Sequence, residues 1–350
     1  MYKPYNLSDV EQVPHRFNAI SMFSGVGGGS LGVRLAGGKV LVASEFIPEA
    51  RNAYLRNSPD TIVLSEDIRK LTGQDFLDAS GLKKGEVDLV EASPPCSGFS
   101  TAGLRQEGWG VAKKYSSTSQ IVDDLFFEFA RVLKEIQPKF FISENVKGLL
   151  MGSAKHLLGS EQLGLFGDHE DTIFHALTNA GYKVRFNVLN SKNFGVPQSR
   201  ERLIIVGVRD DIDFNYRYPK PTTRNYTTLS EAFYGIENTT NQLSDADISR
   251  FAIGKEALNL KPGEQSEKYF SLTKQRPDRY SDTLTASAST LSAASIIHWD
   301  SRKFTVPEAI RIMGFPDDIF VGNQYAHCIE RLGRAITPVV YQKAITNLPL

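Results

Sequence analysis

The residue that most directly suggests chemistry is Cys96, one of two cysteines in the chain. It follows an apolar stretch, 87–92, that predicts a buried strand, and it comes directly after Pro94 and Pro95. Consecutive prolines fix φ and remove backbone donors, so the strand ends there and the thiol is held on a stiff turn. Ligands bind at this carboxyl edge of open α/β sheets. We therefore expect a presented, reactive thiol, whereas Cys328 is equally well explained as a small buried hydrophobe.

A glycine-rich turn after an expected strand at 17–23 is a second candidate site. Backbone amides at a helix start favour anions and close approach, so the turn suits a nucleotide or nucleoside. Glu45 lies at the spacing of the acid that binds ribose in such units, and Asp67, after the next strand, suits an adenine amine. A merely structural turn with two solvated acids is the alternative. The turn consists of Phe23, Ser24, Gly25, Val26, Gly27 and Gly28.

Further polar residues stand next to later strands. Glu144 follows an expected strand at 140–143, and Gln198, Arg200 and Arg202 introduce another at 202–208. In a parallel sheet these strand ends would converge with Cys96 along one edge, with a nucleoside at one half and a thiol beside a carboxyl group at the other. Taken alone, Glu144 could equally be a surface acid in a salt bridge.

Strands that alternate with helices over the first part of the chain predict an α/β fold with a doubly wound, mostly parallel sheet. The strands expected besides those above are 39–44, 61–64 and 182–190. The expected helices are 48–54, 122–136, 171–180, 306–313 and 329–347. Residues 97–120 lack a sustained period and are interpreted as a long loop, of the kind that often serves as a functional lid.

Composition changes after Val208, because the chain then becomes polar and rich in Asn, Thr, Ser, Tyr and Pro. We therefore predict two domains: a catalytic domain formed by 1–208 with 296–350, and a smaller domain at 209–295. The final helices are expected to pack back on the first domain.

Overall composition is ordinary for a globular protein, with 41% hydrophobic and 23% charged residues among 350. No apolar run approaches the roughly 20 residues of a membrane span, and no signal-peptide core is visible at the N-terminus. With only two cysteines, we expect a cytoplasmic location in a bacterium or a phage-infected cell. A net charge of zero does not by itself indicate nucleic-acid binding, but basic residues can still cluster on one face of the protein.

In this order, the motifs resemble those of the DNA cytosine C5-methyltransferases across nearly the whole chain. The turn from Phe23 resembles the loop that binds S-adenosylmethionine (AdoMet). The further motifs are Pro94-Pro95-Cys96, Glu144-Asn145-Val146, Gln198-Ser199-Arg200-Glu201-Arg202, Arg276-Pro277 with Asp282-Thr283-Leu284-Thr285, and Arg311-Ile312-Met313-Gly314-Phe315-Pro316. The resemblance implies an AdoMet-dependent fold with 209–295 as the target-recognition domain.

The resemblance also implies the chemistry. Cytosine C5 is a poor nucleophile, so the Cys96 thiolate would add to C6 and convert C5 into an enamine carbon that takes the methyl group. Glu144 at N3 and Arg202 near O2 would stabilise the charge that develops on the ring, and Arg200 belongs to the same motif. The Pro94 carbonyl would accept from the exocyclic amine. The cofactor contacts implied besides the turn are Glu45, Phe46, Asp67, Ile68, Pro94, Arg334 and Ala335; no metal is implied.

A base inside a stacked duplex is out of reach, so the resemblance implies base flipping in double-stranded DNA. The loop at 97–120 would then close over the flipped base, and a plain solvent loop is the alternative. The implied DNA contacts are Ser97, Arg105, Gln106, Trp109 and Gln198, with Lys113 and Lys114 available for phosphates. In the recognition segment, Arg217, Lys220, Arg224, Asn225 and the tyrosines are unranked candidates.

The sequence departs from the family pattern at Arg334, where an asparagine is usual. A fixed cation near a sulfonium is unfavourable unless an anion lies between them. In one interpretation Arg334 turns outward or pairs with a carboxylate, and the protein transfers methyl. In the other, Arg334 favours a donor with an extra carboxylate, which would give carboxymethylcytosine.

Other functions remain open on the sequence. A nucleotide-dependent dehydrogenase would use the glycine turn but leave Cys96, Glu144 and Arg202 unexplained. The same chemistry on tRNA is a second alternative, and a non-catalytic DNA-binding relative a third. We expect a monomer that acts on DNA, with no membrane partner and with a cognate restriction endonuclease as a further possible partner.

Overall fold

The computed structural model describes residues 2–95, 113–115, 118–120, 124–150, 172–223, 225–237, 249–290 and 295–350. Contacts divide the chain into two compact units, each described separately below. The sheet unit contains 13–189, 201–219 and 341–350, and the second unit contains 1–12, 190–200 and 220–340. The predicted domains, 1–208 with 296–350 and 209–295, use other boundaries and stay a prediction.

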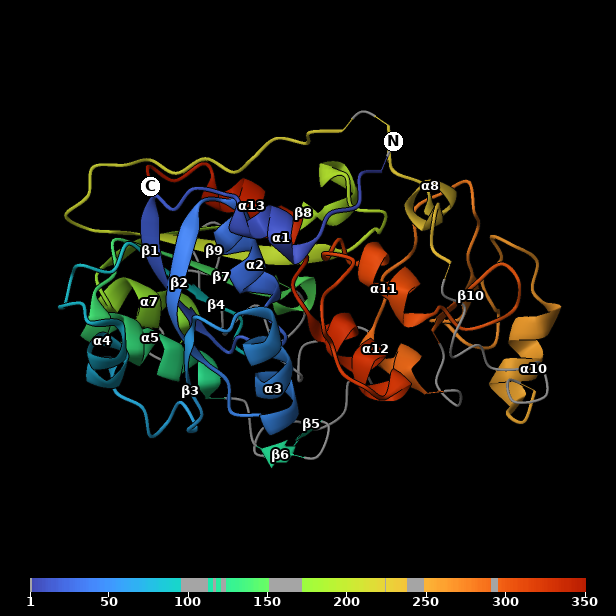
Figure 1. Ribbon diagram of the computed structural model, residues 1–350, viewed down its shortest axis with the longest axis horizontal. Coiled ribbons are helices and arrows are strands. Elements are labelled where there is room, and N and C mark those ends of the chain that lie inside the picture. Colours follow the sequence, from blue (N-terminus) through green and yellow to red (C-terminus); the bar gives the residue numbers. More distant parts are fainter. Residues whose placement is uncertain are drawn as a thin grey trace. The chain divides into compact units, whose positions relative to one another are not determined.

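The sheet unit is built on a seven-stranded sheet in the order β3-β2-β1-β4-β7-β9-β8 (Figure 1). Its first five strands pair in parallel, and β9 runs antiparallel to β7. The strands are β1 (Phe17–Met22), β2 (Gly38–Ser44), β3 (Ile62–Leu64), β4 (Leu89–Ala92), β7 (Phe140–Val146), β8 (Tyr182–Asn190) and β9 (Glu201–Arg209). The predicted α/β fold with a mostly parallel sheet is confirmed.

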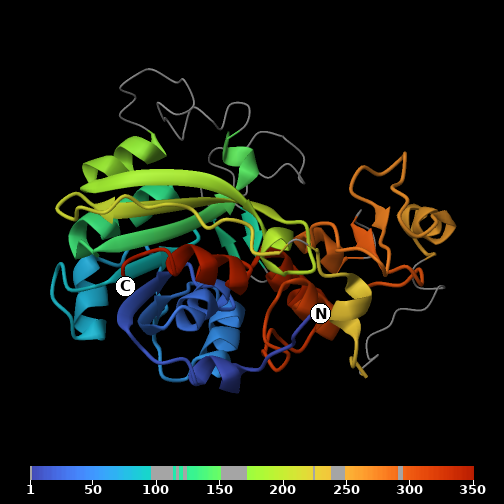
Figure 2. The ribbon, with the colours of Figure 1, turned by 90° about the horizontal axis from the view of Figure 1, so that it is seen from above.

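Helices cover both faces of this sheet. Figure 2 shows α2 (blue) and α7 (green) on opposite sides of the strands. The helices of the unit are α2 (Gly28–Leu35), α3 (Pro48–Asn57), α4 (Gly73–Ser80), α5 (Leu125–Ile136) and α7 (Ile173–Asn179). Helix α4 is absent from the sequence interpretation, although Thr72 and Asp75 form a capping box at its start.

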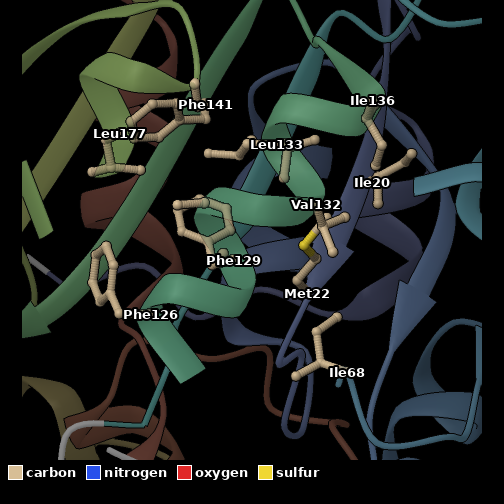
Figure 3. Close-up of a cluster of buried hydrophobic side chains, with 14 of the residues drawn as sticks. Ile20, Met22, Ile68, Phe126, Phe129, Val132, Leu133, Ile136, Phe141 and Leu177 are labelled. Carbon is tan, nitrogen blue, oxygen red and sulfur yellow. The ribbon is translucent and has the colours of Figure 1, made fainter. Parts of the chain in front are cut away.

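The core of the sheet unit lies between α5 and the strands (Figure 3). The predicted apolar face of α5 is buried, and Phe129 packs edge-to-face against Phe126 at 5.8 Å and against Phe141 of β7 at 5.6 Å between ring centroids. Such aromatic pairs add to the free energy of burial. Pro138 ends the helix as expected, because it cannot donate to the preceding turn.

The second unit holds shorter elements around Gln198 and Arg200. They are α1 (Leu7–Glu11), η5 (Ser191–Phe194), α8 (Leu229–Phe233), α10 (Ala252–Asn259), β10 (Thr273–Lys274), η6 (Ala286–Ser289), β11 (Ile296–Ile297), α11 (Val306–Ile312) and α12 (Tyr325–Arg334). Strands β10 and β11 pair in parallel. A small core joins Ile253, Leu272 and Ile297.

Two sequence expectations are wrong in detail. The single helix expected at 329–347 is two helices, α12 and α13 (Pro338–Ile345), since Pro338 lacks the N–H that a continuous helix requires. The described part of the loop expected at 97–120 contains an antiparallel pair, β5 (Lys113–Tyr115) and β6 (Thr118–Gln120). None of the helices within the described ranges combines the length and apolar character needed to cross a bilayer.

Replacing Phe129 with alanine tests the core. The ring is fully buried, so Phe129→Ala should lower the free energy of unfolding by about 3–5 kcal/mol, measured by urea denaturation. Phe127→Ala, on the half-buried neighbour, is the matched control and should lose clearly less. Equal losses in the two variants would contradict the assigned core face of α5.

Candidate active site

The carboxyl ends of β4 and β7 bring two predicted site segments together. The strands pair in parallel with Ala92 opposite Ser143, so Ser93, directly after β4, lies beside Glu144, which is still within β7. The Ser93 hydroxyl donates to a Glu144 carboxylate oxygen at 3.1 Å. The described residues stop at Pro95, so Cys96 itself lies just outside them. Glu144 therefore stands beside the turn that carries the predicted nucleophile.

Arg202 completes this arrangement from the antiparallel strand β9. Its Nε lies 2.7 Å from Oε1 of Glu144. Arg202 pairs with Val146 in the β7–β9 register, two residues beyond Glu144, which places both side chains on one face. Burial lowers the pKa of the Arg202 guanidinium, and the Glu144 carboxylate opposes that shift. The result is a mostly buried carboxylate with a fixed cationic partner and a hydroxyl donor.

Asn145 joins the same two segments in a way that sequence reasoning missed. Its Nδ2 donates to the Pro94 carbonyl at 3.4 Å, while its Oδ1 accepts from the backbone N–H of Val146 at 2.8 Å. Tyr341 donates to the Ala92 carbonyl at 3.3 Å. The Pro-Pro turn is thus held by side chains as well as by its prolines.

The glycine turn between β1 and α2 is tied to the end of β2 by Glu45. One carboxylate oxygen accepts from the Gly25 N–H at 2.7 Å and the other from the Ile47 N–H at 2.8 Å. Burial raises the pKa of Glu45, and these two N–H groups oppose the rise. Gly25 and Gly27 have φ of +56° and +95°, values that favour glycine. A Cβ on Gly25 would meet no described atom within 4 Å. The backbone of the turn therefore borders open space at this position, which fits the close approach of a bound nucleoside.

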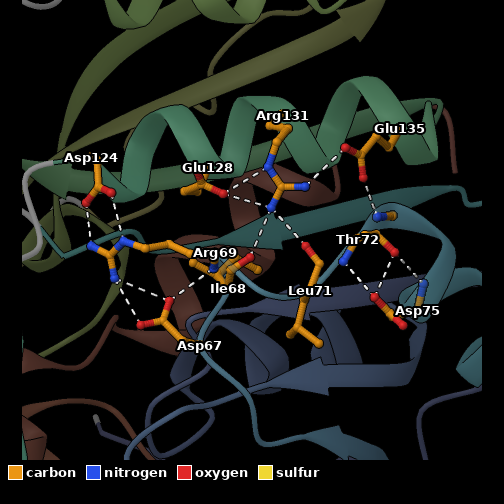
Figure 4. A network of polar contacts seen from close by, with 11 residues as sticks. Asp67, Ile68, Arg69, Leu71, Thr72, Asp75, Asp124, Glu128, Arg131 and Glu135 are labelled. Atoms are coloured by element: carbon orange, nitrogen blue, oxygen red, sulfur yellow. Dashed lines mark hydrogen bonds and ion pairs between the residues drawn. The ribbon is translucent and has the colours of Figure 1, made fainter.

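The remaining cofactor candidates of the sheet unit have different surroundings. The Phe46 ring is 37% exposed, which leaves an aromatic surface next to Glu45. The Asp67 carboxylate is paired with Arg69 at 3.0 Å, and Arg69 also pairs with Asp124 (Figure 4). The Ile68 carbonyl accepts from Arg131 of α5 at 3.0 Å. The predicted adenine contact of Asp67 stays a prediction, and the arginine pairs around it were not foreseen.

In the second unit, Gln198 and Arg200 are completely buried and bound to backbone. Gln198 donates to the Ile312 carbonyl at 3.1 Å and accepts from the Leu284 N–H at 2.8 Å. Arg200 donates to the carbonyls of Leu284, Gly333 and Ala335 at 2.9–3.0 Å. These bonds connect three segments of the unit and give both side chains a structural role. Their predicted roles toward DNA and the target base stay predictions.

Arg334 lies in the last turn of α12, where its guanidinium pairs with Glu330 one turn earlier at 3.0 Å. The side chain is 40% exposed. Of the two interpretations of Arg334, the pairing agrees with the one in which it turns outward or pairs with a carboxylate, and the carboxylate here is that of Glu330. Cys328, on the same helix, is buried, which raises the pKa of its thiol.

A buried carboxylate that the sequence interpretation missed lies on β4. Glu91 is 1% exposed and accepts from the hydroxyls of Ser21 and Ser30, the latter at 3.3 Å. Ser21 is 2.6 Å from Ser24 of the glycine turn, and Tyr54 donates to Ser30 at 2.9 Å. Since the hydrogen-bond donors to Glu91 among the described residues are hydroxyls, burial dominates and raises the pKa of Glu91 from 4.5 to about 7. Its position inside an apolar strand gave no signal of this contact.

Comparison with known proteins identifies the family. The family model "C-5 cytosine-specific DNA methylase" matches residues 17–349. The chain belongs to this family. It is 30% identical over 337 residues to the type II methyltransferase M1.HphI of Haemophilus parahaemolyticus, covering 92% of this chain and 84% of that protein.

Solved structures agree with the fold. A prophage-encoded DNA modification methyltransferase (E. coli) superposes with a TM-score of 0.70 at 21% identity, covering 95% of this chain and 98% of that one. The S. pombe Dnmt2 methyltransferase gives 0.66 at 18% identity, covering 94% and 97%. As a C-5 cytosine DNA methylase, the protein is an AdoMet-dependent transferase with DNA as substrate, which excludes the dehydrogenase interpretation of the glycine turn.

Arg200→Lys tests whether Arg200 is structural. A lysine cannot reach three carbonyls at once, so the variant should lose about 2–4 kcal/mol in free energy of unfolding, measured by urea denaturation. Arg276→Lys, at an exposed arginine paired with Asp278, is the control and should change stability little. If Arg200→Lys keeps the wild-type stability but loses turnover, Arg200 takes part in the reaction instead.

Glu91→Gln tests the buried carboxylate through pH. The unfolded chain ionises Glu91 above pH 4.5, whereas the folded chain keeps the proton until about pH 7. Folding therefore takes up a proton in that window, and Glu91 lowers the stability by about 3 kcal/mol as the pH rises through it. Urea unfolding of both proteins at pH 5, 6 and 8 should show this fall in the wild type only. Parallel pH profiles would contradict the raised pKa.

Proposed function

We propose that the protein transfers the methyl group of AdoMet to C5 of a flipped cytosine in double-stranded DNA through a covalent adduct of Cys96. The observation that carries the proposal is the group formed by Ser93, Glu144 and Arg202 at the ends of adjacent strands. This group lies beside Pro94 and Pro95, which directly precede Cys96 in the sequence. It supplies a carboxyl group and a fixed cation where negative charge would develop on the base.

In the proposed reaction, the Cys96 sulfur forms a bond to C6 and the ring takes up the electron pair. Glu144 holds a proton at N3, and the Arg202 guanidinium stabilises the charge near O2. Bound AdoMet supplies an electrophilic methyl on a sulfonium. Once C5 holds the methyl group and the donor sulfur keeps the electron pair of the broken methyl–sulfur bond, water accepts the C5 proton. The C5–H electron pair then forms the C5–C6 double bond and expels the Cys96 sulfur, which restores the free thiolate and the aromatic ring.

We propose that the glycine turn, together with Glu45 and Phe46, forms the AdoMet-binding site. Glu45 already binds two backbone N–H groups, and each of its oxygens retains a lone pair for a ribose hydroxyl. The ion pair of Arg334 with Glu330 supports methyl as the group transferred, because the guanidinium has a protein carboxylate as partner. We therefore propose AdoMet as the donor and keep a carboxylated analogue of AdoMet as the alternative.

The wider setting is inferred from the relatives, which are named type II methyltransferases. On that ground we infer a role in restriction-modification, beside a cognate endonuclease, in the bacterial cytoplasm or an infected cell. One chain carries every motif of the proposed reaction, which favours a monomer. Residues 209–295 are the proposed target-recognition domain, and Ser97, Arg105, Gln106 and Trp109, all outside the described residues, are proposed to contact the DNA.

Mass spectrometry of digested DNA tests the proposal. Wild-type protein with AdoMet should yield 5-methylcytosine, and Cys96→Ala should lower the rate at least about 10⁴-fold while DNA binding remains. Cys328→Ala is the matched control, because that thiol is buried in α12, and it should keep its activity. Turnover retained in Cys96→Ala would overturn the mechanism.

Two further arms of the same assay separate the alternatives. Carboxymethylcytosine formed from an equimolar mixture of AdoMet and its carboxylated analogue would favour the second donor. Methylated product from tRNA but not from duplex DNA would identify RNA as the substrate.

A further inference from the structure

Two cations and two tyrosines form a compact cluster in the second unit. The Lys192 ammonium lies 4.9 Å from the ring centroid of Tyr226 and 4.5 Å from that of Tyr280. The two rings meet edge-to-face at 5.2 Å. The Arg279 guanidinium lies 4.8 Å from the Tyr280 ring. We call these four residues the Lys-Tyr cluster.

Backbone and hydroxyl bonds fix the segments that carry this cluster. The Lys192 carbonyl accepts from the Thr223 hydroxyl at 3.2 Å, and the Arg279 carbonyl accepts from the Leu229 N–H at 2.8 Å. Ser281, next to Tyr280, forms a parallel bridge with Gln198. The cluster therefore lies on backbone that is anchored within its own unit.

The charge of the cluster is not compensated by acids. Within the described ranges, neither Lys192 nor Arg279 forms an ion pair with a carboxylate, whereas nearby Arg276 is paired with Asp278. Both cations donate instead to the Tyr280 hydroxyl, at 3.0 and 3.4 Å. These two hydrogen bonds lower the pKa of the Tyr280 phenol. Tyr226 and Arg279 are exposed, so a ligand can approach.

We propose that the Lys-Tyr cluster binds a backbone phosphate of the DNA substrate. An anion with several acceptor oxygens suits two fixed cations and a phenol, and a phosphate contact positions the duplex without reading its sequence. The tyrosine rings hold the cations in place by cation–π contact, so little side-chain entropy is lost on binding. The inference rests on the proposed function, because it takes DNA as the substrate.

Salt-dependent DNA binding tests the proposal. Affinity for a fluorescent duplex is measured by anisotropy over a series of salt concentrations, with wild type, Lys192→Met and Arg279→Met. Loss of one phosphate contact should lower the slope of log affinity against log salt by about 0.9, equally for duplexes of different sequence. Lys192→Arg should restore the slope. Arg276→Met is the matched control, because its charge is already paired, and it should leave the slope unchanged.

The outcomes separate the two proposals. A wild-type slope in both Lys192→Met and Arg279→Met would overturn the phosphate site and leave an acidic protein partner as the better explanation of the cluster. A loss confined to one DNA sequence would also overturn it, since it would indicate a base contact. Failure of the proposed function shows instead in the wild type, as absence of 5-methylcytosine from duplex DNA. Arg279 is exposed, so its variant should fold even if Lys192→Met does not.

Discussion

The parallel, in-register pairing of β4 with β7 is the constraint on which the active site of this methylase depends. With Ala92 opposite Ser143, the next residue of each strand emerges at the same edge, and Ser93 meets Glu144 there. Strand β9 runs the other way, so its beginning, and not its end, lies at that edge. Arg202 therefore lies near the beginning of β9 and Glu144 near the end of β7, whereas Cys96 follows the last residue of β4 in the sequence.

Three buried acids of the sheet unit show how partners set the behaviour of one chemical group. Among the described residues, Glu144 is bound by a guanidinium and a hydroxyl, Glu45 by two backbone N–H groups, and Glu91 by hydroxyls. Opposite charges and N–H donors both favour the charged form of a buried carboxylate, whereas burial favours the protonated form. Glu144 therefore places a carboxylate bound to a cation beside the Pro-Pro turn, Glu45 fixes the glycine turn, and burial raises the pKa of Glu91 to about 7.

The sequence predicted the elements that depend on local patterns. Buried parallel strands are apolar runs, and the strand expected at 140–143 lies within β7, which pairs in parallel with β4. Pairings between distant segments were not predictable, because spacing does not reveal which side chains meet across a fold. The bond from Asn145 to Pro94 and the pairing of Arg69 with Asp124 are of this kind. The break before Pro338 was signalled by the proline itself.

Arg200 and Arg202 show why a motif does not assign one role to all its members. Strand β9 begins at Glu201, so Arg200 lies before it and belongs to the second unit, whereas Arg202 lies within the sheet. Alternate residues of a strand point to the same face, but this rule does not apply to the two arginines because Arg200 lies outside the strand. A guanidinium offers several donors in a rigid plane, which suits three converging carbonyls in one case and a carboxylate in the other. The same type of side chain therefore has two roles on either side of the start of β9. Arg200 connects backbone segments of the second unit, and Arg202 forms an ion pair with Glu144.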